Sequence, residues 1–155
     1  MSFQISKTAQ KWFKGVETQA PFNKTTSMDI YYICFLVGIN SGKEPREPED
    51  GRTFLAAGVG WPTSYTESMY TIIAMFLDSE VDRFAINRDD KEDVKDHVDK
   101  YIDPSNPMKL SPLAIKIMDS ISYAGFLEIH DELEAPTQVN VLISEYTKLL
   151  NKYIS

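Results

Sequence analysis

The sequence has little cysteine and histidine and no long apolar run. It has one cysteine among 155 residues, so it cannot form an internal disulfide. It has no run of about 18 apolar residues, which excludes a membrane-spanning helix of ordinary length. The amino-terminal segment from Met1 to Thr8 lacks the apolar core of a secretory signal. We therefore expect a cytoplasmic protein that does not contact a membrane.

Histidine is also scarce. The two histidines, His97 and His130, are far from each other and from Cys34 in the sequence, and they match neither a zinc quartet nor a motif that pairs a cysteine with a histidine. The acidic string from Asp89 to Asp93 lacks the central glycine of an EF-hand loop and is typical of a helix amino terminus. We expect no metal, no cofactor and no catalytic residue.

The charge is unevenly distributed. The net charge is -7 and the sequence pI is about 4.8, which disfavours nucleic acid as a partner because phosphate binding needs clustered Lys and Arg. Between Asp78 and Asp103 ten acidic residues accompany five basic ones, so this stretch contributes -5 of the total. The rest of the chain is nearly neutral and leaves room for a local basic patch.

Apolar residues are plentiful, at 43% of the chain with 12% aromatic residues. A chain of 155 residues is long enough for one well-filled core and buries about 68–70% of its unfolded surface. Helical periodicity recurs in most segments, and the sequence contains no internal repeat. The sequence therefore predicts an all-α fold: a single compact domain over residues 1–155, built as a bundle of five to seven helices.

The most apolar segment, Ile30 to Gly38, predicts a buried central helix over about 28–41, with a buried strand as the alternative. Ser27 is the candidate N-cap and Gly42 the candidate C-cap. The sequence from Gly38 to Lys43 looks like a phosphate-binding loop, but its glycines enclose three residues instead of four, and Glu44 replaces the required Ser or Thr. We therefore interpret Gly42 as a helix end.

Caps and periodicity predict further helices. Ser6 is the N-cap of a helix that ends near Glu17, and Ser64 with Glu67 forms a capping box before a helix that starts near Tyr65. A narrower apolar stripe on a charged segment predicts a surface helix that ends before Pro104, and the last helix covers about 138–153.

The segment after Ser111 predicts a helix whose pattern changes at Gly125. Ser111 is the N-cap and Pro112 the first helical residue. Beyond Gly125 the same helix would turn Glu128 toward the apolar side, so we expect a kink or a restart that returns Glu128 to solvent. The alternative is a strand restart, which would give a short β-hairpin near 126–143.

The polar segment after the central helix is the candidate interaction surface. The candidate partner-binding residues are Lys43, Arg46, Arg52, Phe54 and Trp61. Neighbouring acidic residues neutralise most of the basic charge, so a larger protein complex or a homo-oligomer fits this segment better than DNA. A DNA-backbone-binding accessory protein is one alternative. Another is an enzyme whose site uses dispersed residues around Glu128 and His130.

Two stretches, 29–43 and 122–129, together resemble small accessory proteins encoded with bacterial DNA-phosphorothioation and related anti-phage loci. The first is an apolar helix that leads to Gly42, Lys43 and a proline-containing loop, and the second runs from Ser122 to Ile129. The resemblance covers about 23 residues. It implies a non-catalytic component of a larger nuclease, ATPase or modification complex, and it assigns no role to any single residue.

Overall fold

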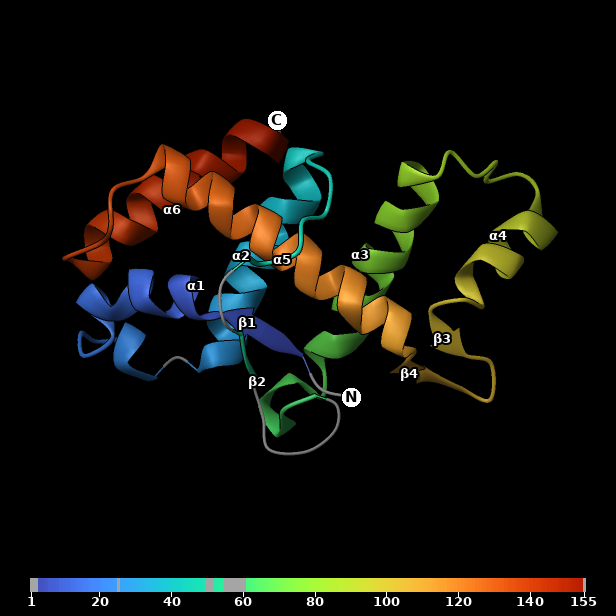
Figure 1. Cartoon of the computed structure of the whole chain (residues 1–155), viewed down its shortest axis with the longest axis horizontal. Coiled ribbons are helices and arrows are strands. Elements are labelled where there is room, and N and C mark those ends of the chain that lie inside the picture. Colours follow the sequence, from blue (N-terminus) through green and yellow to red (C-terminus); the bar gives the residue numbers. More distant parts are fainter. Residues whose placement is uncertain (1–2, 25, 50–51, 55–60, 155) are drawn as a thin grey trace. The chain divides into compact units, whose positions relative to one another are not determined.

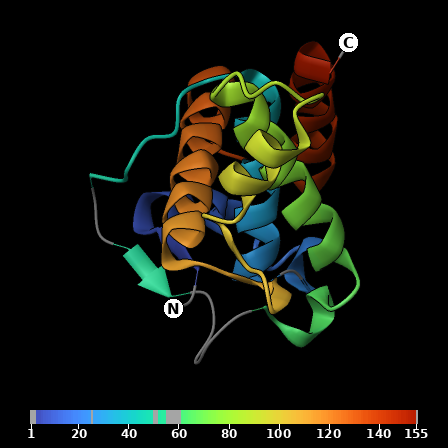
Figure 2. The same ribbon diagram turned by 90° about the vertical axis from the view of Figure 1, so that its right-hand side faces the viewer.

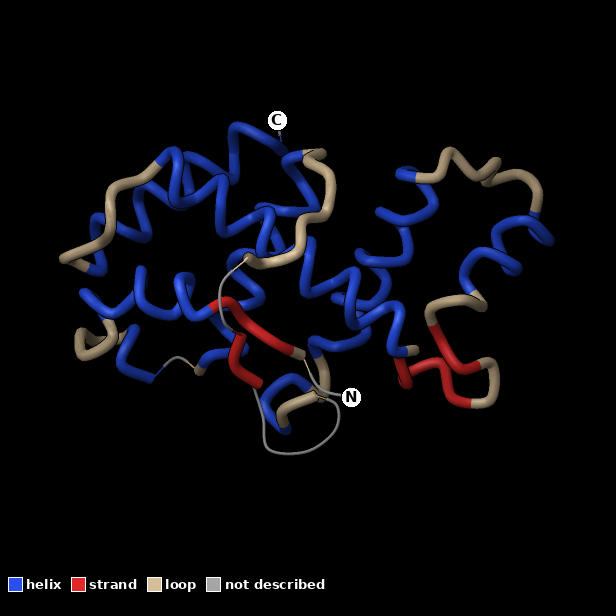
Figure 3. The backbone as a smooth tube through the Cα atoms, in the orientation of Figure 1, coloured by secondary structure: helices blue, strands red, loops and turns tan. Residues whose placement is uncertain are grey.

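The computed structural model describes residues 3–24, 26–49, 52–54 and 61–154, without the side chains of 52–54, 107 and 108. Helices dominate this part of the chain (Figure 3), and the mainly α prediction is confirmed. The six described α-helices are α1 (Lys7–Trp12), α2 (Ser27–Ser41), α3 (Ser68–Arg83), α4 (Lys91–Val98), α5 (Pro112–Glu132) and α6 (Val139–Ile154). Three short 3₁₀ turns also occur: η1 (Phe13–Val16), η2 (Phe22–Lys24) and η3 (Thr63–Tyr65).

Two antiparallel ladders accompany the described helices (Figure 1). Strand β1 (Gln4–Ser6) pairs with β2 (Arg52–Phe54), with Ile5 opposite Thr53. Strand β3 (Ile102–Asp103) pairs with β4 (Asn106–Leu110), with Ile102 opposite Leu110. The helix expected to end before Pro104 therefore stops at Val98, because the following residues form this hairpin.

The chain divides into two compact units. The terminal unit holds the described residues 4–24, 26–49, 52–54 and 119–154, and the middle unit holds Phe3 and residues 61–118. The boundary falls within α5, after Met118. The expectation of a single domain over 1–155 stays a prediction, and each unit is described by itself below.

Helix α2 is the central element of the terminal unit. In Figure 2 it lies, in blue, between orange α5 and red α6. Its side chains Met28, Tyr31, Cys34, Phe35 and Val37 are all buried, as expected for a helix that is apolar on nearly every side. The strand alternative for this segment is wrong.

The ends of α2 are set by short-range hydrogen bonds. Its N-cap is Thr26 and not Ser27, because Thr26 and Asp29 form a reciprocal capping box. Its C-cap is Gly42 with a φ of 70°, which confirms the interpretation of this glycine as a helix end. Ser6 and Ser111 also cap helices as predicted, since their hydroxyls accept from Ala9 and Ala114 amides.

Helix α5 continues through Gly125 as one helix, so the expected restart, as a helix or as a strand, is wrong. A Cβ atom at Gly125 would lie 1.8 Å from the carbonyl oxygen of Cys34, and one at Gly38 would lie 2.1 Å from that of Ile121. The two glycines let the backbones of α2 and α5 approach closely. The apolar pattern widens around Gly125 because α5 is buried on more than one side: Ala124 and Phe126, about 200° apart around the helix, are both buried.

Two further predictions are corrected. The β-hairpin near 126–143 does not form, because residues 126–132 and 139–143 are helical. The Ser64–Glu67 capping box does not form either: Ser64 lies inside η3, and α3 begins at Ser68 with no side-chain cap. Backbone bonds from Tyr65 to Pro62 and from Thr66 to Thr63 close the 3₁₀ turn instead.

Candidate functional site

The predicted interaction residues Lys43 and Arg46 lie on one exposed segment of the terminal unit. Lys43 Nζ is 3.6 Å from Glu128 Oε1, and an Arg46 guanidinium nitrogen is 3.2 Å from Glu49 Oε1. The amide of Arg46 also donates to the carbonyl of Ser120 on α5 at 3.1 Å. Both cations therefore have acidic partners within the chain, which lowers the positive potential available to phosphate.

The other three predicted residues are placed differently. Arg52 and Phe54 contribute backbone to β2, and their side chains lie outside the described part of the structure. Trp61 belongs to the middle unit, where its ring meets Phe3 edge to face at a centroid distance of 4.8 Å. The role of these residues in partner binding stays a prediction.

Glu128 and His130 have separate surroundings. Glu128 is partly buried, with 18% of its side chain exposed, and it accepts a 2.5 Å hydrogen bond from the Tyr153 hydroxyl on α6. Burial and this carboxylate raise the pKa of Tyr153 to about 12. His130 is exposed beside Asp131, 3.5 Å away. Glu128 therefore does not return to solvent as expected, because α5 continues as one helix and Lys43 and Tyr153 pair with its carboxylate.

A buried polar cluster in the middle unit was not predicted. Glu80 on α3 is fully buried, and its carboxylate accepts two hydrogen bonds from Arg83, at 3.0 and 2.7 Å, and one from the Tyr101 hydroxyl at 2.8 Å. His97 Nε2 is 3.4 Å from the same hydroxyl. Burial and the Glu80 carboxylate raise the pKa of Tyr101. The hydrogen bonds of this cluster join side chains of the middle unit to one another, and the bond from Tyr101 to Glu80 ties α3 to the segment after α4.

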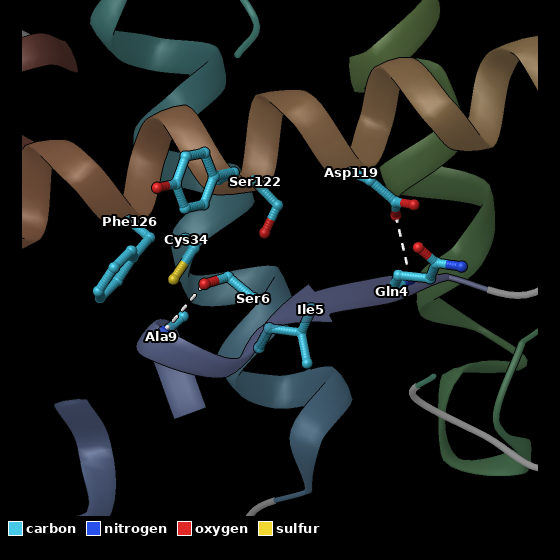
Figure 4. A pocket seen from close by; sticks show the side chains of 9 residues that line it. Gln4, Ile5, Ser6, Ala9, Cys34, Asp119, Ser122 and Phe126 are labelled. Atoms are coloured by element: carbon cyan, nitrogen blue, oxygen red, sulfur yellow. Dashed lines mark hydrogen bonds between the residues drawn. The ribbon is translucent and has the colours of Figure 1, made fainter. Parts of the chain in front are cut away.

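Another polar group lies between β1, α2 and α5 of the terminal unit. Figure 4 shows Ser6, Cys34 and Ser122 directed toward the same small space, with Asp119 hydrogen-bonded to the Gln4 amide. The space measures about 10 Å³, which is no more than one water molecule needs. Burial raises the pKa of the Cys34 thiol and so opposes its nucleophilic thiolate form. The Cys34 thiol and the Asp119 carboxylate both line this space, but the space is too small for a substrate.

The terminal unit also has an open apolar groove. It has a volume of about 280 Å³, close to the lower bound of roughly 300 Å³ for ligand pockets. Its lining residues come from η1, η2, α2, α6 and the segment before η2: Phe13, Pro21, Phe22, Ile33, Val139, Leu142, Ile143 and Tyr146. Seven are apolar, and Tyr146 is the only one with a hydrogen-bonding side chain. The groove can therefore bind an apolar group through van der Waals contact and the hydrophobic effect, but apart from the Tyr146 hydroxyl its lining has no acid, base or nucleophile for catalysis.

Two side chains hold the walls of the apolar groove together by bonds to the backbone. Gln19 donates to the carbonyl of Thr137 at 2.6 Å and accepts from the amide of Val139 at 2.9 Å, which fixes the start of α6. The Tyr146 hydroxyl donates to the carbonyl of Ile33 at 2.9 Å, which fixes α6 to α2 two turns further on. Burial raises the pKa of Tyr146, so this donor keeps its proton.

Helix α6 carries the exposed edge of the groove. Ile143 is 50% exposed although it lines the groove. Residues 150 and 154 follow it at intervals of seven and four, so Leu150 and the 60% exposed Ile154 share its side of the helix. An apolar strip made of Ile143, Leu150 and Ile154 therefore continues the groove along α6.

No protein-family model, curated protein or solved structure matches this chain significantly. Within the described residues, no group of three or more His, Cys, Asp or Glu side chains is arranged to hold a metal ion. In the same part of the chain, no helix has both the length and the apolar character needed to cross a membrane. The function is therefore argued from the geometry of the sites above.

Proposed function

We propose that this protein is a non-catalytic interaction subunit that binds another protein through the apolar groove. The observation that carries this proposal is the groove itself, an open apolar space of about 280 Å³ between segments joined by Gln19 and Tyr146. Closing it with apolar side chains of a partner would remove its walls, Ile143 included, from water. Protein interfaces commonly include an apolar or aromatic side chain of one partner that fills a pocket on the other.

The exposed polar segment contributes less to this proposal than the sequence suggested. Lys43 and Arg46 each have an acidic partner, so a DNA backbone would have to displace Glu128 and Glu49. DNA-backbone binding is therefore the less supported alternative. We retain the segment as a secondary contact, consistent with its exposed side chains.

Catalysis around Glu128 and His130 has the least support. The Glu128 carboxylate is engaged by Tyr153 and Lys43, whereas the His130 ring lies beside Asp131 and Phe126. The two residues are two positions apart on a continuous helix, which directs their side chains about 200° apart. An acid and a base that act on one substrate need a shared space.

We propose further that the partner belongs to a bacterial anti-phage defence or DNA-processing complex. This part of the proposal is based on the resemblance of residues 29–43 and 122–129 to accessory proteins of such loci. The first of these stretches covers most of α2, which supplies Ile33 to the groove. A subunit of this kind would assist a larger enzyme and would have no activity of its own.

Site-directed photocrosslinking in native cells tests the proposed function. A photoreactive amino acid replaces Ile143, and the matched control carries it at Val141, which is 54% exposed but lies about 200° around the same helix. We expect one discrete protein adduct from position 143 and none from position 141. The crosslinked protein, once purified, should bind the wild-type chain and should lose binding to an Ile143→Asp variant but not to Val141→Asp.

Absence of any adduct at position 143 would contradict the proposal. Equal adducts from 143 and 141 would contradict it as well, because the contact would then be unrelated to the groove. Far-ultraviolet circular dichroism of both Asp variants serves as the folding control. Both substituted positions are about half exposed, so neither change is expected to unfold α6.

A further inference from the structure

We infer that the segment received by the apolar groove is an amphipathic α-helix with acidic residues beside its apolar stripe. This inference rests on the proposed function, because it specifies the chemistry of the protein partner. Two independent features of the terminal unit carry it: the elongated apolar strip on α6 and the sign of the charge on the opposite wall.

The shape of the apolar surface fits a helix. The groove residues of α6, Val139, Leu142, Ile143 and Tyr146, recur at helical spacing over about two turns. The strip through Leu150 and Ile154 extends this surface to the end of α6. From 139 to 154 the apolar surface is about 22 Å long at 1.5 Å per residue. A helix laid beside α6 presents residues at i, i+3, i+4 and i+7 to such a surface.

The charged residues in the wall opposite α6 indicate which polar residues the partner helix would carry beside its apolar stripe. The turns η1 and η2 supply Phe13 and Phe22 to the groove, and the charged residues within these two turns are Lys14 and Lys24, both exposed. From Lys7 to Lys24 the chain has four lysines and one glutamate, a net charge of +3 in a protein of net charge -7.

The polar positions of α6 next to the strip add no compensating charge. Thr147 and Asn151 follow Ile143 at four and eight residues and are uncharged, whereas Glu145, Lys148 and Lys152 lie around the other side of the helix. The turns η1 and η2 that supply one wall of the groove therefore contain two exposed lysines, and the α6 positions beside the strip are neutral. Acidic residues beside the apolar stripe of a partner helix complement this pattern, and basic ones oppose it.

Peptide selection with the purified full-length protein tests this inference. Random peptides of about 16 residues, the length of α6, are selected for binding to the wild-type chain and counter-selected against Ile143→Asp. We expect the enriched peptides to have apolar residues at helical spacing with Asp or Glu beside them, and to gain helical circular dichroism on binding. Affinity is then measured by fluorescence anisotropy.

The charge requirement is tested on the same peptides. A Lys14→Glu/Lys24→Glu double variant should weaken their binding about tenfold, and the difference from wild type should shrink as salt rises. A Lys148→Glu/Lys152→Glu double variant is the charge-matched control, since both lysines lie around the far side of α6. It should bind the peptides within about twofold of wild type.

Several results would overturn the inference. These are enriched peptides that are neutral or basic beside the apolar stripe, peptides that bind without becoming helical, or no peptide whose binding depends on Ile143. A dimer of the protein alone that is lost in Ile143→Asp would show a second copy in the groove and would overturn it too. If crosslinking from position 143 still identifies a partner in these cases, the proposed function stands while the helical, acidic partner segment falls.

Discussion

The hydroxyl of Tyr101 donates a 2.8 Å hydrogen bond to Oε2 of Glu80, a carboxylate with no exposure to solvent. Arg83 supplies the charge that a buried carboxylate needs, and Tyr101 supplies a donor from the segment after α4. The bond joins residues 21 positions apart and fixes the end of α4 against α3 within the middle unit.

Removal of this donor should destabilise the middle unit. Tyr101→Phe keeps the ring but leaves the buried Glu80 carboxylate with hydrogen bonds from Arg83 alone. We expect the free energy of unfolding to fall by about 1–3 kcal/mol in urea titrations. Tyr70→Phe is the control, because Tyr70 is 58% exposed, and it should change stability by less than about 0.5 kcal/mol. Equal effects of the two changes would refute the role of the bond.

The close crossing of α2 and α5 should not tolerate a methyl group. Gly125→Ala places a Cβ atom 1.8 Å from the carbonyl oxygen of Cys34, so one helix must shift. We expect a loss of roughly 3 kcal/mol or more in thermal or urea unfolding. Gly42→Ala meets no atom within 4 Å and carries only the strain of a φ of 70°, so it should cost about 1 kcal/mol. A smaller loss for Gly125→Ala than for Gly42→Ala would contradict this packing.

Alkaline pH should destabilise the protein through Tyr31. Burial, and then the charge and hydrogen bond of Asp119, raise the pKa of Tyr31 well above the ordinary tyrosine value of about 10. The unfolded chain therefore releases this proton first, so its stabilising effect is complete below about pH 10 and decreases as pH rises above that value. Urea titrations between about pH 8 and pH 11 should show falling stability, with a shallower fall in Tyr31→Phe. An unchanged slope in that variant would assign the effect to other groups.

Gln19 should be needed to form the groove. Gln19→Ala removes the donor to Thr137 and the acceptor for the Val139 amide, so α6 loses its attachment at its first residue. We expect a loss of about 1–2 kcal/mol in the free energy of unfolding and faster amide hydrogen exchange in the first turn of α6. Gln10→Ala removes only a long 3.4 Å bond to Ser27, and it should leave the exchange of α6 unchanged. Exchange that is equally unaffected by Gln19→Ala would refute the attachment.

The thiol of Cys34 should be unreactive in the folded protein. It is buried, and burial raises its pKa, so both access and thiolate formation are suppressed. Reaction with an aromatic disulfide reagent should be slow in buffer and complete within minutes in concentrated urea, followed by absorbance. Rapid labelling without denaturant would show that the space around Cys34 opens to solvent.

The positions of several helices were predictable because their signals are local. The cap at Ser6, the start at Ser111 and Pro112, and the end at Gly42 each depend on residues within one turn of one another. The start of α3 was mispredicted for the same reason. Ser64 and Glu67 have the spacing of a capping box, but backbone bonds in the 3₁₀ turn η3 replace it.

The apolar groove was not predictable, because its walls are distant in the sequence. Phe13, Leu142 and Tyr146 lie in segments that the sequence predicts to be helical, yet helical periodicity does not reveal which other side chains cover the apolar face of a helix. Residues 13–33 and 139–146 meet only in the folded terminal unit, where Gln19 and Tyr146 join them. The predicted surface around Lys43 and Arg46 was correctly expected to be nearly neutralised, but the pairing with Glu128 depends on the path of α5.

The sequence by itself determined the mainly helical class and the buried character of α2, because periodicity, caps and apolar content act over a few residues. Only the tertiary structure decided that α5 passes Gly125 unbroken, that Glu80 is buried with Arg83 and Tyr101, and that an apolar groove remains open beside α6. The physical reason is that close packing, carboxylate pairing and groove formation depend on which distant surfaces meet, and local sequence patterns carry no information on that meeting.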